Sequence, residues 1–156
     1  MNIGGIISSS FTPYPGIAYE IYVSGCTRHC KECHNPEMWD FNYGTSLDME
    51  KLLEDMKSRR KEFDIVAILG GDLLCHSTGE AMQFMVPLLS HFKNKKFWLF
   101  TGADLEDIPD VYFEMFDVIK YGPYKDEQKQ QGFPASKNQG VWKKKCGTKK
   151  QRKNTV

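Results

Sequence analysis

The chain has 156 residues, and its 21 lysines and arginines nearly balance 20 acidic residues, which gives a formal net charge of +1. This length is typical of one domain and buries enough surface for a hydrophobic core without disulfide or metal staples. The 40% of apolar and 13% of aromatic residues exclude an intrinsically disordered chain. No apolar stretch approaches the roughly 18 residues of a membrane span, and no secretory signal peptide is recognised. We therefore expect a cytoplasmic protein without a membrane partner.

Charge is distributed unevenly along the chain. Residues 143–156 contain seven basic and no acidic residues, whereas the preceding residues carry 14 basic and 20 acidic side chains, a balance of −6. We therefore expect a single domain over residues 1–142 and a basic C-terminal tail over residues 143–156. A block of like charges is typically solvated and flexible, and this expectation is favoured over a role in steering an acidic partner surface.

Apolar residues form four short runs with strand character. The runs are rich in β-branched and aromatic residues and are bounded by polar or glycine-containing segments, a pattern that predicts β-strands. They span residues 17–23, 65–69, 97–100 and 118–121. The unbroken run at 65–69 is typical of a parallel strand that is covered on both faces.

Helical patterns separate these strands. Thr45 and Asp48 are spaced as a capping box, which predicts a helix beginning there with its apolar residues on one face. Ser77 and Glu80 form a second box before a longer helical pattern, in which Pro87 is expected to introduce a kink. These two helices connect the first three predicted strands.

The alternation of strands and helices predicts right-handed crossovers and a parallel sheet. A short helix is expected over residues 111–116, before the fourth strand, and residues 122–156 show no regular pattern. Four strands are too few to close a barrel. The expected fold class is therefore α/β, an open partial (β/α) barrel with parallel strands.

Polar or glycine-containing loops follow the predicted strands. A cysteine-containing loop follows the first strand, Gly70-Gly71-Asp72 follows the second, and Thr101-Gly102 follows the third. The carboxyl ends of parallel strands share one edge of the sheet, where ligands of α/β folds bind. We therefore expect these loops to meet at one site.

Three of the five cysteines lie in the first loop, where Cys26, Cys30 and Cys33 form the pattern Cys-x3-Cys-x2-Cys. An odd, clustered set indicates metal binding rather than a disulfide framework. Three thiolates select a soft centre, which is zinc, copper(I) or an iron–sulfur cluster. The cluster is favoured over zinc because a structural zinc site would need a fourth protein ligand. Candidates for that ligand are His29, His34, Cys75 and Cys146. Otherwise, Cys75 is expected to be a small buried hydrophobic residue.

These motifs resemble those of the radical S-adenosylmethionine superfamily. The stretch Cys-His-Asn-Pro-Glu-Met-Trp at 33–39 is similar to that of activating enzymes of glycyl-radical enzymes, and Gly70-Gly71-Asp72 corresponds to the superfamily's Gly-Gly-Glu segment. Further likenesses lie at residues 15–16, 23–26, 101–102, 120–124 and 135–139. Within the superfamily, the chain most resembles the activating proteins of anaerobic (class III) ribonucleoside-triphosphate reductase, over roughly residues 13–142.

The resemblance implies a [4Fe–4S] cluster held by Cys26, Cys30 and Cys33, with S-adenosyl-L-methionine bound at the iron that lacks a cysteine. Reductive cleavage of this cofactor would release methionine and a 5′-deoxyadenosyl radical, which would abstract hydrogen from a glycine of the reductase large subunit. An external donor such as reduced flavodoxin would supply the electron. The residues implied to contact S-adenosyl-L-methionine are Glu32, Cys33, His34, Gly70, Gly71, Asp72 and Thr101.

Two of these positions depart from the superfamily pattern. Glu32 stands where an aromatic residue often lies against the adenine, so stacking from this position is not expected. Asp72 replaces a glutamate that is one methylene longer, and either carboxylate can accept hydrogen bonds from the cofactor's amino group. Gly70 and Gly71 would permit close approach of the methionine moiety.

Three other functions stay open. The chain could activate another glycyl-radical enzyme such as pyruvate formate-lyase, act as an iron–sulfur electron carrier, or be a zinc-binding module whose basic tail contacts nucleic acid. The basic tail lacks interleaved aromatic residues. We therefore expect no nucleic-acid partner.

Overall fold

The computed structural model describes residues 1–145; residues 146–156, with Cys146 and most of the basic tail, lie outside this range. The strands are β1 (Asn2–Ser10), β2 (Ala18–Val23), β3 (Thr45–Ser46), β4 (Ile65–Gly70), β5 (Lys96–Phe100), β6 (Val118–Tyr121) and β7 (Gly140–Lys143). The α-helices are α1 (Met49–Ser58), α2 (Thr78–His91) and α3 (Asp110–Met115). Short 3₁₀ helices are η1 (Pro36–Trp39), η2 (Leu73–Cys75), η3 (Leu105–Asp107) and η4 (Asp126–Gln128). Within residues 1–145, no helix is long and apolar enough to cross a membrane.

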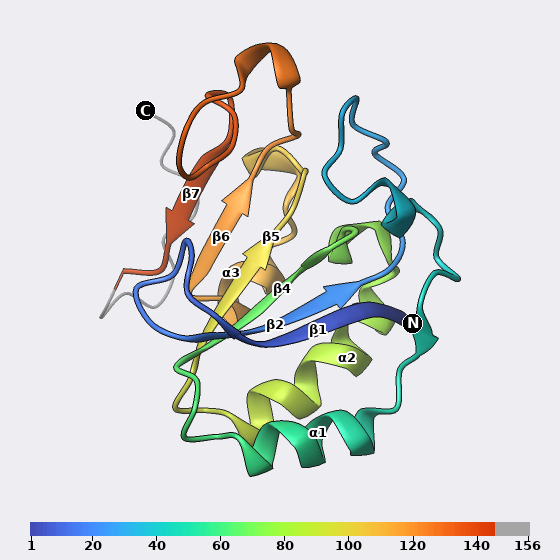
Figure 1. The fold of residues 1–156 in the computed structure, drawn as a ribbon, viewed down its shortest axis with the longest axis vertical. Helices are drawn as coiled ribbons and strands as arrows, with labels where there is room; N and C mark the ends of the chain where they lie inside the picture. Colours follow the sequence, from blue (N-terminus) through green and yellow to red (C-terminus); the bar gives the residue numbers. More distant parts are fainter. Residues whose placement is uncertain (146–156) are drawn as a thin grey trace.

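The strands form one sheet with the order β3-β1-β2-β4-β5-β6-β7. Its centre, β2, β4, β5 and β6, is parallel, and Figure 1 shows these four arrows fanning toward the side of the molecule where the loop after β2 lies. These are the four strands that the sequence predicts. The expected parallel α/β arrangement is therefore confirmed for the centre of the sheet.

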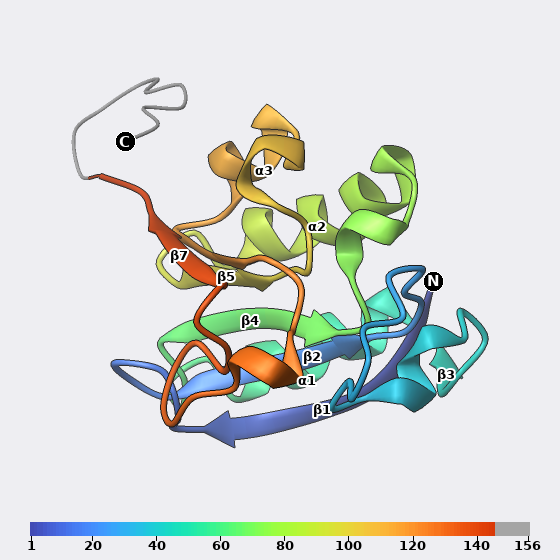
Figure 2. The same ribbon diagram turned by 90° about the horizontal axis from the view of Figure 1, so that it is seen from above.

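The margins of the sheet differ from the prediction. β1 and β3 on one side and β7 on the other run antiparallel to their neighbours, and Figure 2 shows β1 and β7 on opposite sides of the parallel strands. The described sheet is therefore open and mixed rather than entirely parallel. The sequence of β1 does not show a strand pattern, because glycines and serines, which are weak strand formers, interrupt its apolar residues. β7 corrects the expectation that the chain after residue 121 is irregular.

The starts of α1 and α2 follow capping chemistry, with one correction. Thr45 lies in β3 and does not cap a helix; instead Asp48 alone caps α1, and its carboxylate accepts a hydrogen bond from Lys51 N at 3.1 Å. The capping box of α2 is confirmed: Ser77 Oγ accepts from Glu80 N, and Glu80 Oε2 accepts from Ser77 N, each at 3.2 Å.

The two faces of the sheet are packed differently. One face packs against the helices in the main core, which includes the fully buried Tyr19, Ile68, Leu88 and Phe116. The other face carries a smaller cluster from the strands and the segment before β2, namely Tyr14, Ala18, Ile65, Ala67, Trp98 and Val118. Burial on both faces holds the parallel strands, and therefore the loops at their carboxyl ends, in fixed relative positions.

Candidate metal centre

The loops that follow β2, β4 and β5 meet at the carboxyl edge of the parallel strands, as the sequence predicts. Gly71 N donates to Val23 O at 2.7 Å, and Asp72 N donates to Gly25 O at 2.9 Å. The loop after β4 is thereby tied to the start of the cysteine loop. The Asp72 carboxylate also accepts a hydrogen bond from Thr101, in the loop after β5. The three segments form one connected site.

Asp72 is the centre of this connection and is only 2% exposed. Its carboxylate accepts from Arg28 Nε at 2.6 Å and from Thr101 Oγ1 at 2.9 Å. It also accepts from the main-chain nitrogens of Leu74 and Gly102, both at 3.0 Å. Burial disfavours the charged form of Arg28, but the attraction of Asp72 outweighs this effect and raises the Arg28 pKa. Since donors of the chain itself already bind the carboxylate, its expected contact with a cofactor amino group stays a prediction.

Gly70 and Gly71 allow the loop after β4 to lie directly against the cysteine loop. Gly70 has a φ of +104°, in the region that favours glycine. A Cβ atom at Gly71 would lie 2.5 Å from Gly25 O and 2.9 Å from Met38 O. The close approach expected at these glycines is therefore made by the chain's own backbone. The approach of a methionine moiety stays a prediction.

The first cysteine of the loop has an anchored backbone. Gly25 N donates to Met38 O at 2.8 Å, and Cys26 N donates to Trp39 O at 3.2 Å, so η1 supports the start of the loop. The main-chain N–H of Arg28 donates to the Cys26 sulfur. An N–H donor at a cysteine sulfur is one of the means by which proteins tune iron–sulfur clusters.

Beyond this point the loop turns sharply around the other two cysteines. Cys33 N donates to Cys30 O at 3.1 Å, which closes a turn between them. His29 and Glu32 have φ values of 47° and 57°, an uncommon conformation for residues other than glycine. The side chains of Cys30 and Cys33 are partly exposed. This part of the loop therefore presents two thiols near the surface.

The donor types at this loop suit an iron–sulfur cluster. Cys26, Cys30 and Cys33 are free thiols of intermediate exposure. As placed in residues 1–145, no three histidine, cysteine or acidic side chains are gathered closely enough to hold a single metal ion. Three thiolates from one loop can instead bind three separate irons of a larger cluster, whose irons are spread over several ångströms. The residues present therefore fit a cluster by their chemistry.

The other predicted cofactor contacts have two kinds of environment. Glu32 and His34 are exposed on the cysteine loop. Thr101 is 2% exposed, donates to Asp72 and accepts from Ala103 N at 3.1 Å. Thr101 therefore positions Asp72 in this structure, whereas Glu32 and His34 are exposed to solvent on the loop.

Two further residues border the site, and sequence reasoning did not assign them. The Tyr124 ring packs against the His34 ring with centroids 4.7 Å apart, which brings the loop after β6 to the cysteine loop. Lys120 is partly buried at the end of β6; burial lowers its pKa to about 8, while the charges of Asp72 and Cys30 act in the opposite direction. The sequence signal for Lys120 was its position as a lysine in an otherwise apolar strand.

Cys75, which the sequence offered as one candidate for a fourth ligand, also lies at this site. It is half-buried, and its sulfur accepts hydrogen bonds from Thr27 N and Thr27 Oγ1, each at 3.4 Å. Its thiol also shares a hydrogen bond with Cys26; this bond and those from Thr27 lower the Cys75 pKa, while the same bond raises that of Cys26. The expectation of a small buried hydrophobic residue is therefore wrong.

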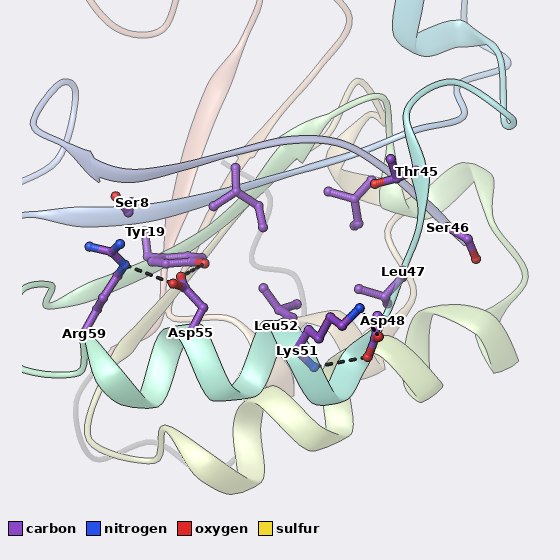
Figure 3. Close-up of a pocket in the computed structure, with 12 residues that line it drawn as sticks. Ser8, Tyr19, Thr45, Ser46, Leu47, Asp48, Lys51, Leu52, Asp55 and Arg59 are labelled. Carbon is purple, nitrogen blue, oxygen red and sulfur yellow. Dashed lines mark hydrogen bonds and ion pairs between the residues drawn. The ribbon is translucent and has the colours of Figure 1, made fainter.

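A pocket of about 590 Å³ lies elsewhere, between β1, β3 and α1. Figure 3 shows that its charged groups are engaged by neighbouring side chains or main-chain atoms: Asp55 binds both Tyr19 Oη at 2.7 Å and Arg59 Nε at 3.1 Å. Asp48 is engaged in the same way, by Lys51. No residue of the cysteine loop lines this pocket. It is therefore separate from the candidate metal centre.

Comparison with known proteins decides between the metals. Residues 14–142 match the family described as "4Fe-4S single cluster domain". The chain belongs to this family. The match includes all three cysteines of the loop, and it favours the iron–sulfur interpretation over zinc.

Individual relatives agree with the family match. The chain is 29% identical over 146 residues to an anaerobic ribonucleoside-triphosphate reductase-activating protein of Enterobacteria phage T4, covering 91% of this chain and 94% of the relative. It is 29% identical to the protein of that name from Vibrio cholerae, over 76% and 81% of the two chains. A third, from Pasteurella multocida, is 32% identical over 60% and 61%. The resemblance read from the motifs is therefore confirmed.

Proposed function

We propose that the chain is a radical S-adenosylmethionine oxidoreductase that activates an anaerobic ribonucleoside-triphosphate reductase. In this proposal, S-adenosyl-L-methionine is reductively cleaved, and the 5′-deoxyadenosyl radical abstracts hydrogen from a glycine of the reductase large subunit. The observation that carries the proposal is the family match over residues 14–142, together with the cysteine loop lying against Gly70-Gly71-Asp72 at one sheet edge. The names of the relatives support the same partner.

Cys26, Cys30 and Cys33 are the proposed cluster ligands. When bound, the cluster supplies the electron for cleavage of a sulfonium carbon–sulfur bond. The chain contributes three thiolates, and the Arg28 amide donates to one of them. The partly exposed positions of Cys30 and Cys33 leave their side of the loop accessible to a small molecule.

The proposed cofactor contacts divide between orientation and support. Gly71 lies in van der Waals contact with the start of the cysteine loop, so it sets the distance between the two halves of the site. The hydrogen bond from Thr101 to Asp72 holds the loops after β4 and β5 together. Glu32, Cys33 and His34 are proposed to border the adenosyl group; Glu32 and His34 are exposed, and Cys33 between them is partly exposed.

The reaction needs partners that supply an electron and receive the radical. We propose a reduced flavodoxin as the external electron donor and the cytoplasm as the place of action. Because a glycine of a large protein must reach the site, the ligand-bearing loop has to be accessible, and its partly exposed thiols meet this requirement. Activation of pyruvate formate-lyase is the alternative within the same chemistry.

Reconstitution under anaerobic conditions tests the proposal. The purified full chain should take up four irons and four sulfides and release 5′-deoxyadenosine when dithionite and S-adenosyl-L-methionine are added, and it should generate a glycyl-radical signal on the anaerobic reductase. Pyruvate formate-lyase is the control substrate. Zinc in place of iron, or a cluster without release of 5′-deoxyadenosine, would refute the activase assignment. A radical on formate-lyase alone would move the assignment to that partner.

A further inference from the structure

Cys75 lies outside the Cys-x3-Cys-x2-Cys pattern, yet its sulfur lies at the cysteine loop. The sulfur is 3.4 Å from both the main-chain nitrogen and the hydroxyl of Thr27, the residue that follows Cys26. The Cys26 and Cys75 thiols are themselves joined by a hydrogen bond. Two cysteines can be bridged when their side chains meet, and the hydrogen bond between these thiols brings their side chains together.

The contact between the two thiols is held from both sides. Cys75 belongs to η2, where its main-chain nitrogen donates to Asp72 O at 2.9 Å and Asp72 caps the helix through Leu74 N at 3.0 Å. The next residue, His76, has its Nε2 atom 2.8 Å from Ser24 O, in the segment that leads to Cys26. These bonds keep Cys75 beside Cys26.

Cys30 and Cys33 are the alternative pair. A turn joins their backbones through the hydrogen bond from Cys33 N to Cys30 O. They also lie in the part of the loop where His29 and Glu32 adopt uncommon φ values. Because a turn already brings their backbones together, a Cys30–Cys33 disulfide is the main alternative to one between Cys26 and Cys75.

We propose that Cys26 and Cys75 form a disulfide in the cluster-free protein when it meets a low-molecular-weight disulfide such as glutathione disulfide. One sulfur attacks glutathione disulfide and releases one glutathione thiol; the second sulfur displaces the other glutathione and closes the Cys26–Cys75 bond. The protein loses two electrons and two protons, and glutathione disulfide becomes two molecules of glutathione.

The disulfide would reversibly protect the cysteines of the cluster-free protein. It removes Cys26 from the set of available thiols, which prevents cluster assembly, and it protects both sulfurs from irreversible oxidation. A thiol reductant restores them. The effect on assembly rests on the proposed ligand role of Cys26, whereas the formation of the bond does not.

Mapping of thiols in the cluster-free full chain tests the bond itself. The protein is incubated with glutathione disulfide, quenched in acid, alkylated and digested for mass spectrometry. We expect a peptide linked through Cys26 and Cys75 as the main product, its absence in Cys75→Ser, and its retention in Cys146→Ser. A dominant Cys30–Cys33 bond, or Cys75 recovered in its alkylated form, would overturn the proposal.

Iron uptake separates this proposal from the proposed function. After removal of glutathione disulfide, the oxidised wild type should assemble a cluster only when a reductant is added, whereas Cys75→Ser should assemble it without one. If cluster assembly is blocked equally in Cys75→Ser, the Cys26–Cys75 bond is not what prevents assembly, and the inference fails. If the bond forms but iron uptake is unaffected, the bond stands and the ligand role of Cys26 fails.

Discussion

The two halves of the candidate site are built in different ways. On the β4 side, Asp72 is 2% exposed and accepts hydrogen bonds from the loops after β2 and β5 as well as its own. On the β2 side, Cys30 and Cys33 are partly exposed in a segment with uncommon backbone angles. The β4 side is a fixed support, whereas the cysteine loop is anchored mainly at its start. Substitutions on the β4 side should therefore change stability, and substitutions of cysteines in the loop should change cluster content.

Replacing a ligand of the exposed half should have the largest effect. We expect Cys30→Ala to abolish cluster assembly and 5′-deoxyadenosine release, because the loop offers no other thiol at that position. In the cluster-free protein, the free energy of unfolding should change by less than about 0.5 kcal/mol, as for most partly exposed positions. Iron and sulfide analysis and urea unfolding measure the two effects. Cys146→Ala is the matched control and should keep its cluster; full iron content in Cys30→Ala would contradict the ligand assignment.

Removing the buried carboxylate should act in the opposite way. Asp72→Ala leaves the donors of Arg28, Thr101 and Gly102 without their acceptor. We expect a loss of about 3 kcal/mol of stability, because an unpaired buried donor or charge is costly even when Arg28 is partly exposed. The midpoint of urea unfolding of the cluster-free protein measures this loss.

An exposed aspartate provides the comparison for this substitution. Asp48→Ala removes the cap of α1, where the side chain is half-exposed, and should cost only about 1 kcal/mol. Equal losses for Asp72→Ala and Asp48→Ala would contradict the picture of Asp72 as the support of the site. Cluster content of Asp72→Ala, measured below its unfolding transition, should stay close to that of the wild type.

The contact between the two halves can be changed at a single glycine. Gly71→Ala places a Cβ atom 2.5 Å from Gly25 O, so the loops must move apart, and we expect a loss of about 2 kcal/mol. Gly79→Ala in α2 is the matched control: its Cβ atom meets nothing within 4 Å, and it should stabilise the protein by about 0.5 kcal/mol through helix propensity. Thermal unfolding distinguishes the two. A neutral Gly71→Ala would show that the halves are not in fixed contact.

Much of this arrangement could be predicted because its signals are local. The four central strands are short, mainly apolar runs, and the position of Gly70-Gly71-Asp72 at the end of one of them predicts its place at the carboxyl edge. The Ser77–Glu80 box likewise depends only on residues three apart. Chemistry that lies within a few residues is visible in the sequence.

The parts that were missed depend on pairing between distant residues. β1 is held by its pairing with β2 rather than by its own propensity, since it contains two glycines and three serines. The Arg28–Asp72 pair joins residues 44 apart, and Cys75 meets Thr27 across 48. No pattern within the segments that contain these residues predicts the two contacts. The roles of Asp72 and Cys75 therefore became visible only in three dimensions.

The smallest expected effect concerns Lys120, which lies under the influence of both halves through Asp72 and Cys30. Burial lowers its pKa to about 8, so between pH 8 and roughly pH 10.4 the folded lysine is neutral while the unfolded lysine stays protonated. The unfolded state then binds more protons, and the contribution of Lys120 to stability improves as pH rises through this window.

Replacement by an uncharged side chain should reveal this cost. We expect Lys120→Met to be more stable than the wild type at pH 7 by about 1 kcal/mol, after allowance for partial exposure, and the gain should shrink between pH 8 and pH 10. Urea unfolding of the cluster-free proteins at intervals of pH measures the difference. Lys51→Met, at a lysine whose side chain is 83% exposed, should show no such trend. A gain for Lys120→Met that is constant up to pH 10 would mean that Lys120 is solvated and belongs to neither half of the site.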